Sequence, residues 1–359
     1  MFEEKRDEVL LLTREMLSAC TNCGECLKPC SFLQKYGTPA AIAKRGMAEN
    51  NLLSAFGCSL CGLCDAVCPE ALSPSSMFIA MRREAITLRL VDLKLYSPWL
   101  NYEKTGGSFF FRRDFIPDGC KTVFFPGCSL PGSHPDAVLA LFIKLRQLEP
   151  DAGLILDCCG KISHDLGLVD KFQNIFSKLM RRLKTAGIKR ILTSCPGCSK
   201  ILKKYSEGFE IVSIYELLGA TSSISFPEAS GKVVAIHDPC TARFDSVQQQ
   251  AVRRLLASSG FTIQELPSSM RTTRCCGQGG MVEATVPGTV RRESEQIASG
   301  VAGKTLVTSC GACCDTLSEV TATIHLADIL TGKIDFESKP VSSFRRWINR
   351  LKLRFVRLT

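Results

Sequence analysis

The cysteines of this chain form repeating patterns whose spacing is typical of metal ligands. Twenty cysteines occur in the 359 residues, and eighteen of them fall into four groups. Two groups are C-x2-C-x2-C-x3-C runs. The first run contains Cys20, Cys23, Cys26 and Cys30, and the second contains Cys58, Cys61, Cys64 and Cys68. Thiolates are soft ligands, and three cysteines at this spacing favour iron–sulfur clusters over zinc. The runs predict two cubane [4Fe–4S] clusters and electron transfer.

The ligands of these two clusters are expected to cross between the runs. In two-cluster ferredoxins the fourth cysteine of each run binds the cluster of the other run. One cluster would then use Cys20, Cys23, Cys26 and Cys68, and the other would use Cys58, Cys61, Cys64 and Cys30. This assignment assumes that the two halves of the module pack as a pseudo-symmetric pair.

The other two groups each contain a lone cysteine, a Cys-Cys-Gly and a C-x2-C. The first five-cysteine group is Cys128, Cys158, Cys159, Cys195 and Cys198. The second is Cys240, Cys275, Cys276, Cys310 and Cys313. Two adjacent cysteines cannot comfortably bind one zinc ion, but they can reach different irons of an extended cluster. These groups therefore predict further iron–sulfur sites.

The segments between the cysteines predict the elements that position them. The stretches 32–56 and 77–90, beside the two runs, have helical patterns, with a Gly-Thr-Pro break in the first. Beyond them, equivalent cysteines recur after a nearly constant interval, which indicates an internal repeat. Its clearest strands are predicted at 121–127, 153–160, 190–195, 232–238 and 305–310, and its clearest helices at 136–148, 168–187, 247–260 and 289–303. Strands that alternate with helices predict parallel α/β sheets, with the cysteines where strands end.

The predicted fold class is α plus α/β: an all-helical two-cluster ferredoxin domain followed by two tandem α/β domains in a pseudo-twofold repeat. The expected boundaries are 1–90, 91–117, 118–228, 229–335 and 336–359. These are the helical domain, a connector, the two α/β domains and a basic amphipathic tail. Phe109, Phe110 and Phe111 of the connector are expected to pack inward.

The repeat resembles the cysteine-rich CCG domain through FFPGCSL, LDCCG, SCPGC, HDPC, CCGQGG and SCGAC. That domain is found in catalytic subunits of heterodisulfide reductases and in iron–sulfur subunits of glycerol-3-phosphate, glycolate and lactate dehydrogenases. The domain order resembles the D subunit of heterodisulfide reductases. The resemblance implies that each complete five-cysteine group holds a non-cubane [4Fe–4S] cluster. It further implies that the ten cysteines are catalytic, as cluster ligands, and that a disulfide is cleaved between the two clusters.

Three functions are compatible with these residues. The first is an oxidoreductase that passes electrons from the ferredoxin-like domain to a thiol/disulfide site. The second is a relay subunit without its own substrate, which carries electrons from a flavoprotein dehydrogenase to quinone. The third is a scaffold, which ten correctly spaced cysteines disfavour. Completeness of both groups favours the first. The resemblance implies a membrane cytochrome b or a flavoprotein subunit as partner, and a small thiol, disulfide or quinone as redox partner.

Several residues outside these groups are candidates for smaller roles. Cys120 and Cys314 are expected to be buried thiols, with Cys314 as an alternative ligand. His237 is a candidate donor to a cluster sulfur, or a satisfied histidine at a strand end. The cations Lys161, Arg243 and Arg274 lie beside cysteines and are candidates to bind an anionic substrate, to offset cluster charge, or to face solvent. No G-x-G-x-x-G follows a strand, so no flavin or nicotinamide site is expected.

The net charge of +10 is concentrated at the C-terminus, where residues 338–359 contain seven basic residues and no acidic one. The rest of the chain is nearly neutral, which argues against a nucleic-acid partner. The tail alternates aromatic and basic residues at helical spacing. Contact with a membrane surface through 340–359 is expected, with docking on a partner subunit or disorder as alternatives. No signal peptide or membrane span is apparent, so a cytoplasmic location is expected, with peripheral contact at the inner face of the cell membrane.

Overall fold

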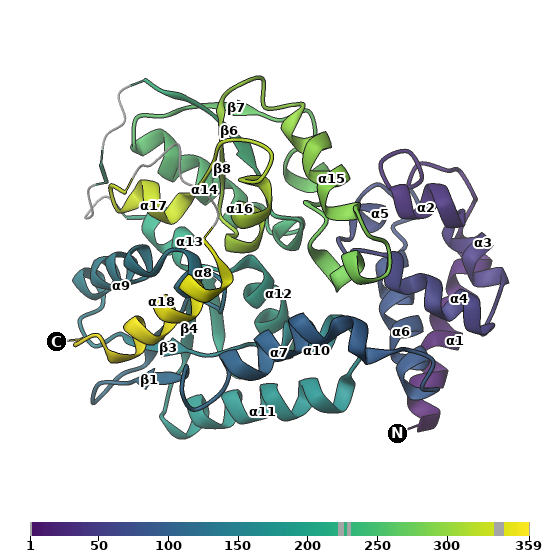
Figure 1. Cartoon of the computed structure of the whole chain (residues 1–359), viewed down its shortest axis with the longest axis horizontal. Helices are drawn as coiled ribbons and strands as arrows, with labels where there is room; N and C mark the ends of the chain where they lie inside the picture. Colours follow the sequence, from purple (N-terminus) through teal and green to yellow (C-terminus); the bar gives the residue numbers. More distant parts are fainter. Residues whose placement is uncertain (1, 222–225, 228–230, 334–340, 359) are drawn as a thin grey trace.

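The structure is a computed structural model that describes residues 2–221, 226–227, 231–333 and 341–358. A helical N-terminal part lies at one end of the molecule, and two sheets with their covering helices form the rest (Figure 1). The structure thus mixes helices and sheets in the predicted order along the chain.

The N-terminal part is built from short helices around one apolar core. Its helices are α1 (Phe2–Ala19), α2 (Ser31–Tyr36), α3 (Pro39–Lys44), α4 (Glu49–Ser54), α5 (Leu63–Ala66) and α6 (Pro74–Thr87), with the 3-10 helix η1 (Ala55–Gly57). The predicted break is explained at Thr38, whose side chain accepts a hydrogen bond from the Ala41 N–H and caps α3, with Pro39 at its first position. Met16, Leu33 and Phe78 are among the buried core residues.

The first sheet has the strand order β1-β3-β2-β4-β5. Its strands are β1 (Arg113–Phe115), β2 (Thr122–Phe125), β3 (Gly153–Leu156), β4 (Arg190–Thr193) and β5 (Glu210–Ser213). β2, β3, β4 and β5 are parallel, whereas β1 pairs antiparallel with β3. The segment 91–117, expected to be a connector, therefore adds an edge strand to this sheet, after η2 (Leu93–Tyr96) and helix α7 (Ser97–Gly106).

The second sheet has the order β7-β6-β8-β9, and every described pairing in it is parallel. Its strands are β6 (Val233–His237), β7 (Thr262–Glu265), β8 (Thr305–Thr308) and β9 (Thr323–His325). This is the order of β3-β2-β4-β5 in the first sheet. The five strands located from sequence are present as β2, β3, β4, β6 and β8, and β1, β5, β7 and β9 are additional.

Helices connect the strands in both units. The first unit contains α8 (Leu130–Ser133), α9 (Pro135–Leu148), α10 (Lys161–Asp165), α11 (Val169–Thr185), α12 (Pro196–Tyr205) and α13 (Ile214–Gly219). The second contains η3 (Cys240–Ala242), α14 (Ser246–Ser258), η4 (Met270–Thr272), η5 (Gly279–Ala284), α15 (Thr289–Ala298), α16 (Gly311–Leu317) and α17 (Leu326–Leu330). α9 of the first unit packs on α17 of the second, and α13 packs on α14.

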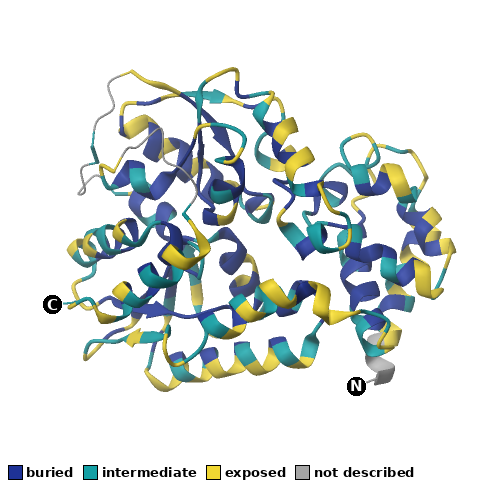
Figure 2. Cartoon of the chain, viewed as in Figure 1, coloured by how far each residue is buried: buried dark blue, intermediate teal, exposed yellow. Residues whose placement is uncertain are grey.

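One apolar core joins the two units. Phe124 and Leu192 of the first sheet and Val234 and Val307 of the second belong to the same buried cluster. The central strands β2, β3, β4, β6 and β8 are largely buried, as Figure 2 shows. Burial of apolar surface between the sheets fixes how the two units face each other, and thereby how the cysteines at their strand ends are placed.

The C-terminal tail forms a helix that packs on the chain itself. Helix α18 (Ser343–Phe355) lies on α8 and α9, and the buried Asn349 side chain donates to the Gly132 carbonyl at 2.7 Å. Contact with a membrane surface through 340–359 therefore stays a prediction, and it concerns the side of α18 that does not pack on the chain. Residues 336–340 and 359 of the predicted tail, and 334–335 at the end of the predicted second α/β domain, lie outside the described residues.

The three phenylalanines of the connector lie in different surroundings. The Phe111 ring packs on Trp347, with ring centroids 4.7 Å apart, as expected for an inward-facing residue. Phe109 and Phe110 are 70% and 69% exposed, so the expectation of inward packing is wrong for these two. Within the described residues, no helix is both long enough and apolar enough to cross a membrane.

Candidate iron–sulfur sites

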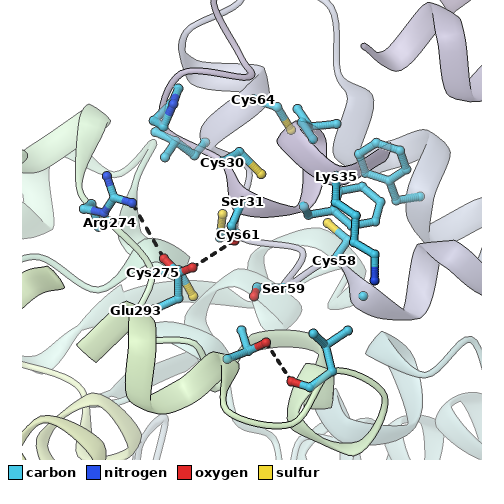
Figure 3. A pocket seen from close by; sticks show the side chains of 18 of the residues that line it. Cys30, Ser31, Lys35, Cys58, Ser59, Cys61, Cys64, Arg274, Cys275 and Glu293 are labelled. Atoms are coloured by element: carbon cyan, nitrogen blue, oxygen red, sulfur yellow. Dashed lines mark hydrogen bonds and ion pairs between the residues drawn. The ribbon is translucent and has the colours of Figure 1, made fainter. Parts of the chain in front are cut away.

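The second four-cysteine run opens into a cavity of about 300 Å³. Cys58, Cys61 and Cys64 line it together with Cys30, which immediately precedes α2 (Figure 3). Burial and the neighbouring Cys61 thiol raise the pKa of Cys30 to about 11. The structure thus brings the fourth cysteine of the first run to the first three cysteines of the second.

The two runs bend with the same backbone conformations. The residue before the second cysteine has a positive φ in both runs, 55° at Asn22 and 51° at Leu60. The glycine after that cysteine also has a positive φ, 79° at Gly24 and 69° at Gly62. In the second run this turn lets the Leu60 N–H donate to the Cys58 sulfur at 3.4 Å. Such N–H donors stabilise thiolates and cluster sulfurs.

In the first run the thiols are closely spaced. Burial and then the nearby Cys20 thiol raise the pKa of Cys26 to about 12. Cys23 is exposed and Cys20 is half-buried. Cys68 is half-buried against the same apolar core as Cys20 and Cys26. A metal bound here would displace the thiol protons, because the thiolate is the form of cysteine that binds metal.

The first five-cysteine group gathers at the carboxyl ends of three strands. Cys128 follows β2, Cys158 and Cys159 follow β3, and Cys195 and Cys198 follow β4 and begin α12. The Cys159 and Cys198 sulfurs are 3.3 Å apart. A hydrogen bond from Cys198 is the largest cause that lowers the pKa of Cys195, to about 7. The φ of Gly127 is +80°, and a side chain there would meet the Cys195 Cβ at 2.9 Å.

The second five-cysteine group repeats this arrangement. Cys240 follows β6, Cys275 and Cys276 follow β7, and Cys310 and Cys313 follow β8 and begin α16. The Cys276 and Cys313 sulfurs are 3.3 Å apart, as in the equivalent pair of the first group. The Cys240 and Cys275 sulfurs are 3.7 Å apart. Every cysteine predicted to act as a ligand in this group therefore lies at the same end of the same sheet.

The two five-cysteine groups face each other across the boundary between the units. η3, which contains Cys240, packs on α12, which begins just after Cys195. On the other side α8, which follows Cys128, packs on α16, and the Ser133 hydroxyl donates to the Asp315 carboxylate at 2.9 Å. Cys128, Cys195 and Cys240 are the half-buried members of the ten, and the other seven are buried.

The second run of the N-terminal part touches the second five-cysteine group directly. A hydrogen bond from the Cys275 thiol is the largest cause that lowers the pKa of Cys61, to about 6. Arg243 fixes this junction, because its guanidinium donates to the Cys61, Arg271 and Thr273 carbonyls at 3.0, 2.6 and 2.7 Å. Three of its N–H groups are therefore engaged by the backbone, which gives the buried Arg243 a structural role at this junction.

A second buried arginine, Arg82 on α6, ties the N-terminal part to both units. Its guanidinium donates to the Cys58 carbonyl at 2.6 Å, to the Asp165 carbonyl at 2.7 Å and to the Gly280 carbonyl at 2.9 Å. Gly280 approaches so closely that a side chain there would meet the Cys58 carbonyl at 2.6 Å. Position 280 therefore has no room for a side chain, which explains the glycine there.

The other two candidate cations occupy different places. Lys161 pairs with Asp165, is partly exposed, and lies near Cys159 and Cys240, one from each five-cysteine group. Burial acts to lower the pKa of Lys161, but Asp165 and the nearby thiolates outweigh it and raise the pKa. Arg274 lines the cavity of the second run, where it lies 3.8 Å from Glu293 (Figure 3). Of the three cations, Lys161 is the one placed between the two groups.

The remaining candidates are buried. Cys120 donates its thiol hydrogen to the Thr122 carbonyl at 3.1 Å, and Cys314 lies within α16. His237, at the end of β6, is 2% exposed, and its Nε2 has no hydrogen-bond partner among the described residues. Burial lowers the pKa of His237, and the nearby Cys276 acts in the opposite direction. An unpartnered ring nitrogen beside a cysteine group suits donation to a cluster sulfur.

Sequence reasoning missed several residues that hold the first group in place. The Tyr102 hydroxyl on α7 donates to the Cys128 carbonyl at 2.8 Å. The Arg350 guanidinium of α18 lies 5.5 Å from the Tyr102 ring and 5.1 Å from the Trp347 ring, and it donates to the Gly106 carbonyl at 2.9 Å. No local pattern marks these residues, because their partners lie far away in the sequence.

The donor set fits iron–sulfur clusters. In both five-cysteine groups, buried sulfurs approach one another in hydrogen-bonded pairs. Thiols gathered in low-dielectric surroundings are the ligands that iron–sulfur clusters use.

Comparisons with known proteins agree with this chemistry. The family description "4Fe-4S dicluster domain" matches residues 16–72, and "Cysteine-rich domain" matches 122–203 and 234–318. Together these matches cover more than half of the chain. A crystal structure of a hypothetical protein from Helicobacter pylori aligns with 93% of this chain and 73% of its own at 10% identity, with a TM-score of 0.49, too low to define a shared fold.

Three curated relatives are similar in sequence to more than half of the chain. The D subunit of dihydromethanophenazine:CoB–CoM heterodisulfide reductase from Methanosarcina mazei is 24% identical over 76% of this chain and 80% of its own. The glycolate oxidase iron–sulfur subunit from Escherichia coli is 23% identical over 80% and 73%. EtfAB:quinone oxidoreductase from Syntrophomonas wolfei is 26% identical over 63% and 36%. The chain therefore contains a 4Fe-4S dicluster domain followed by two cysteine-rich domains, and over most of its length it is similar to the D subunit of heterodisulfide reductases.

Proposed function

We propose that this oxidoreductase passes electrons between its N-terminal dicluster domain and a thiol/disulfide site that lies between the two five-cysteine groups. The observation that carries the proposal is the contact between Cys61 of the second run and Cys275 of the second group. It places a ligand candidate of one domain against a ligand candidate of the next. Electron transfer through protein becomes faster as the separation between centres shortens, so this junction supports an internal route.

The proposed cofactors follow the cysteine sets. Cys20, Cys23, Cys26 and Cys68 would hold one cubane cluster, and Cys58, Cys61, Cys64 and Cys30 a second. Each five-cysteine group would hold one non-cubane cluster, and the two cysteine-rich domains would be related by a pseudo-twofold axis. The common strand order of the two sheets and the reciprocal packing of α9 on α17 and α13 on α14 support this symmetry. When bound, such clusters supply electrons one at a time.

The chain's own residues account for the remaining requirements of disulfide cleavage. Breaking one S–S bond consumes two electrons and two protons and releases two thiols. Cys195 and Cys240, one from each five-cysteine group, are half-buried, so a disulfide would meet these sulfurs more readily than the buried ones. Lys161 is held protonated by Asp165 near Cys159 and Cys240, where its charge favours a sulfur that becomes anionic. The packed units exclude bulk solvent from the buried cysteines.

We also propose redox partners for the two ends of this route. A membrane cytochrome b or a flavoprotein subunit would exchange electrons with the dicluster domain, and a small disulfide or thiol would react at the far end. The alternative is a relay to quinone without a substrate of its own. The similarity to the glycolate oxidase iron–sulfur subunit and to EtfAB:quinone oxidoreductase supports this alternative, so the experiment below includes a quinone analogue.

Reoxidation of the purified, dithionite-reduced protein under anaerobic conditions distinguishes the two functions. Cluster absorbance is followed after addition of a panel of small disulfides and, separately, a menaquinone analogue. We expect rapid reoxidation by at least one disulfide, which Cys276→Ser abolishes and Cys120→Ser preserves. Reoxidation by the quinone analogue alone would instead assign the protein to electron relay.

A further inference from the structure

The most exposed large apolar side chains of the described residues are four phenylalanines. Phe344 is 76% exposed, Phe355 72%, Phe109 70% and Phe110 69%. They come from two segments far apart in the sequence, the turn after α7 and the helix α18. Exposed aromatic side chains grouped in this way mark interaction surfaces more often than single exposed residues do.

Arginine side chains join these rings into one surface. The Phe109 and Phe110 ring centroids are 6.1 Å apart. The Arg354 guanidinium lies 4.7 Å from the Phe109 ring and 5.2 Å from the Phe355 ring, and so bridges the two segments. Phe344 and Phe355 lie about three helical turns apart and therefore on the same side of α18. We call this surface the aromatic–basic face; it contains Phe109, Phe110, Phe344, Arg345, Lys352, Arg354, Phe355 and Arg357.

The fold does not use this face, because α18 is anchored through its other side. Arg346 pairs with Asp315 at 2.9 Å, and Leu353 and Arg350 are buried. The Arg113 guanidinium donates to the Leu353 and Val356 carbonyls at 2.9 and 2.7 Å, which fixes the end of the helix. The exposed phenylalanines therefore project from a firmly held element.

Charge indicates what the face would contact. Arg345, Lys352 and Arg357 are exposed beside the rings, and residues 338–359 contain no acidic residue. Aromatic rings favour the headgroup level of a bilayer, and neighbouring Lys and Arg side chains bind anionic lipid phosphates. The rings protrude from a helix and a turn, which suits insertion into a deformable headgroup layer better than a preformed protein pocket.

We infer that the aromatic–basic face binds the surface of an anionic membrane. The inference goes beyond the proposed function, because lipid binding through this face requires no redox step. It also changes the sequence-based expectation: the inner side of α18 serves the fold, and the contact instead includes Phe109 and Phe110 of a distant segment.

Vesicle sedimentation of the full, iron-loaded protein tests this inference. Vesicles of phosphatidylcholine alone are compared with vesicles that also contain phosphatidylglycerol, at low and high salt. We expect sedimentation with the anionic vesicles only, weakened by salt. The pair Phe109→Ser and Phe355→Ser should reduce binding by about tenfold or more, and so should the pair Arg345→Ser and Lys352→Ser.

Matched substitutions elsewhere provide the controls. Leu11→Ser removes a residue that is 67% exposed on α1. The pair Lys28→Ser and Arg291→Ser removes two cations whose side chains are 71% and 82% exposed. These variants should bind anionic vesicles like the unchanged protein. Absence of binding to anionic vesicles, or equal losses in the control variants, overturns the inference, including the case in which the face binds a protein partner instead. Disulfide reoxidation in solution reports on the proposed function independently.

Discussion

Among single residues, the cysteines outside the four groups test the ligand assignment most sharply. Cys120 and Cys159 are both 3% exposed and both belong to the same apolar cluster. Cys120 is hydrogen bonded to a backbone carbonyl, whereas the Cys159 sulfur faces Cys198. Burial alone therefore does not separate a structural thiol from a candidate ligand, but sequence spacing does.

We predict that Cys159→Ser lowers the iron content of the purified protein and that Cys120→Ser leaves it unchanged. The second substitution replaces a buried thiol, so it should cost only about 1 kcal/mol of unfolding free energy. Iron and acid-labile sulfide per protein, measured together with the visible spectrum, check the prediction. Equal iron loss in both variants would contradict the assignment of Cys159.

Buried histidines predict how stability depends on pH. Burial is the largest cause that lowers the pKa of His164, His237 and His325 in the folded protein. The unfolded chain then binds protons first as pH falls below the ordinary histidine pKa of about 6.5, so stability is present above this range and is lost as pH falls through it.

His325→Asn isolates one of these contributions. The His325 Nδ1 accepts a hydrogen bond from the Ala327 N–H at the start of α17, and an asparagine side chain can accept the same bond without titrating. We expect the variant to be less stable at neutral pH and to lose less stability on acidification than the unchanged protein. Denaturation followed across this pH range gives the two slopes, and parallel slopes would refute the prediction.

Among the secondary-structure elements, the sequence predicts the ones that carry cysteines better than the ones that hold them together. The strands before Cys128, Cys158 and Cys310 are apolar and end at glycine or cysteine, so they can be identified by pattern. β5, β7 and β9 are short and partly polar or lack a distinct boundary. Arg82, Tyr102 and Arg350 could not be predicted, because their roles depend on contacts with distant segments.

Helix α18 illustrates this limit, because one helix carries residues with opposite roles. We predict that Arg350→Met destabilises the protein by ~2 kcal/mol or more, since Arg350 is buried among Tyr102, Phe111 and Trp347. Arg345→Met, an exposed position on the same helix, should change stability by less than about 0.5 kcal/mol. Thermal unfolding of both variants measures the difference. Equal effects would show that α18 is not held by its inner side.

The junction between η5 and the second run gives a further prediction. In Gly280→Ala the added Cβ would meet the Cys58 carbonyl at 2.6 Å, in addition to the strain of a φ of +62°. Gly303→Ala is a matched control, because its φ is +73° and no atom lies within 4 Å. The control should cost only the backbone strain of ~1–2 kcal/mol, and Gly280→Ala clearly more. Chemical denaturation checks this; similar losses would mean that the close approach is unimportant.

In the whole molecule, the arrangement of the three domains gives the cysteine groups an order. The dicluster domain contacts the second cysteine-rich domain through Cys61, Arg243 and Gly280, and the second domain faces the first across the half-buried Cys195 and Cys240. Sequence spacing predicts the groups and their chemistry. It contains no information on which groups touch, because that depends on the packing of the sheets through their common core.

The most direct test of the proposed function counts the products of disulfide cleavage. Reduced protein is mixed anaerobically with a small disulfide, and the thiols released are compared with the electrons that the protein loses, with a menaquinone analogue in a parallel sample. Reduction of a disulfide at the site between the two groups predicts two thiols for every two electrons lost, and no thiol from Cys276→Ser protein. Loss of electrons to the quinone analogue without thiol release from any disulfide would contradict it.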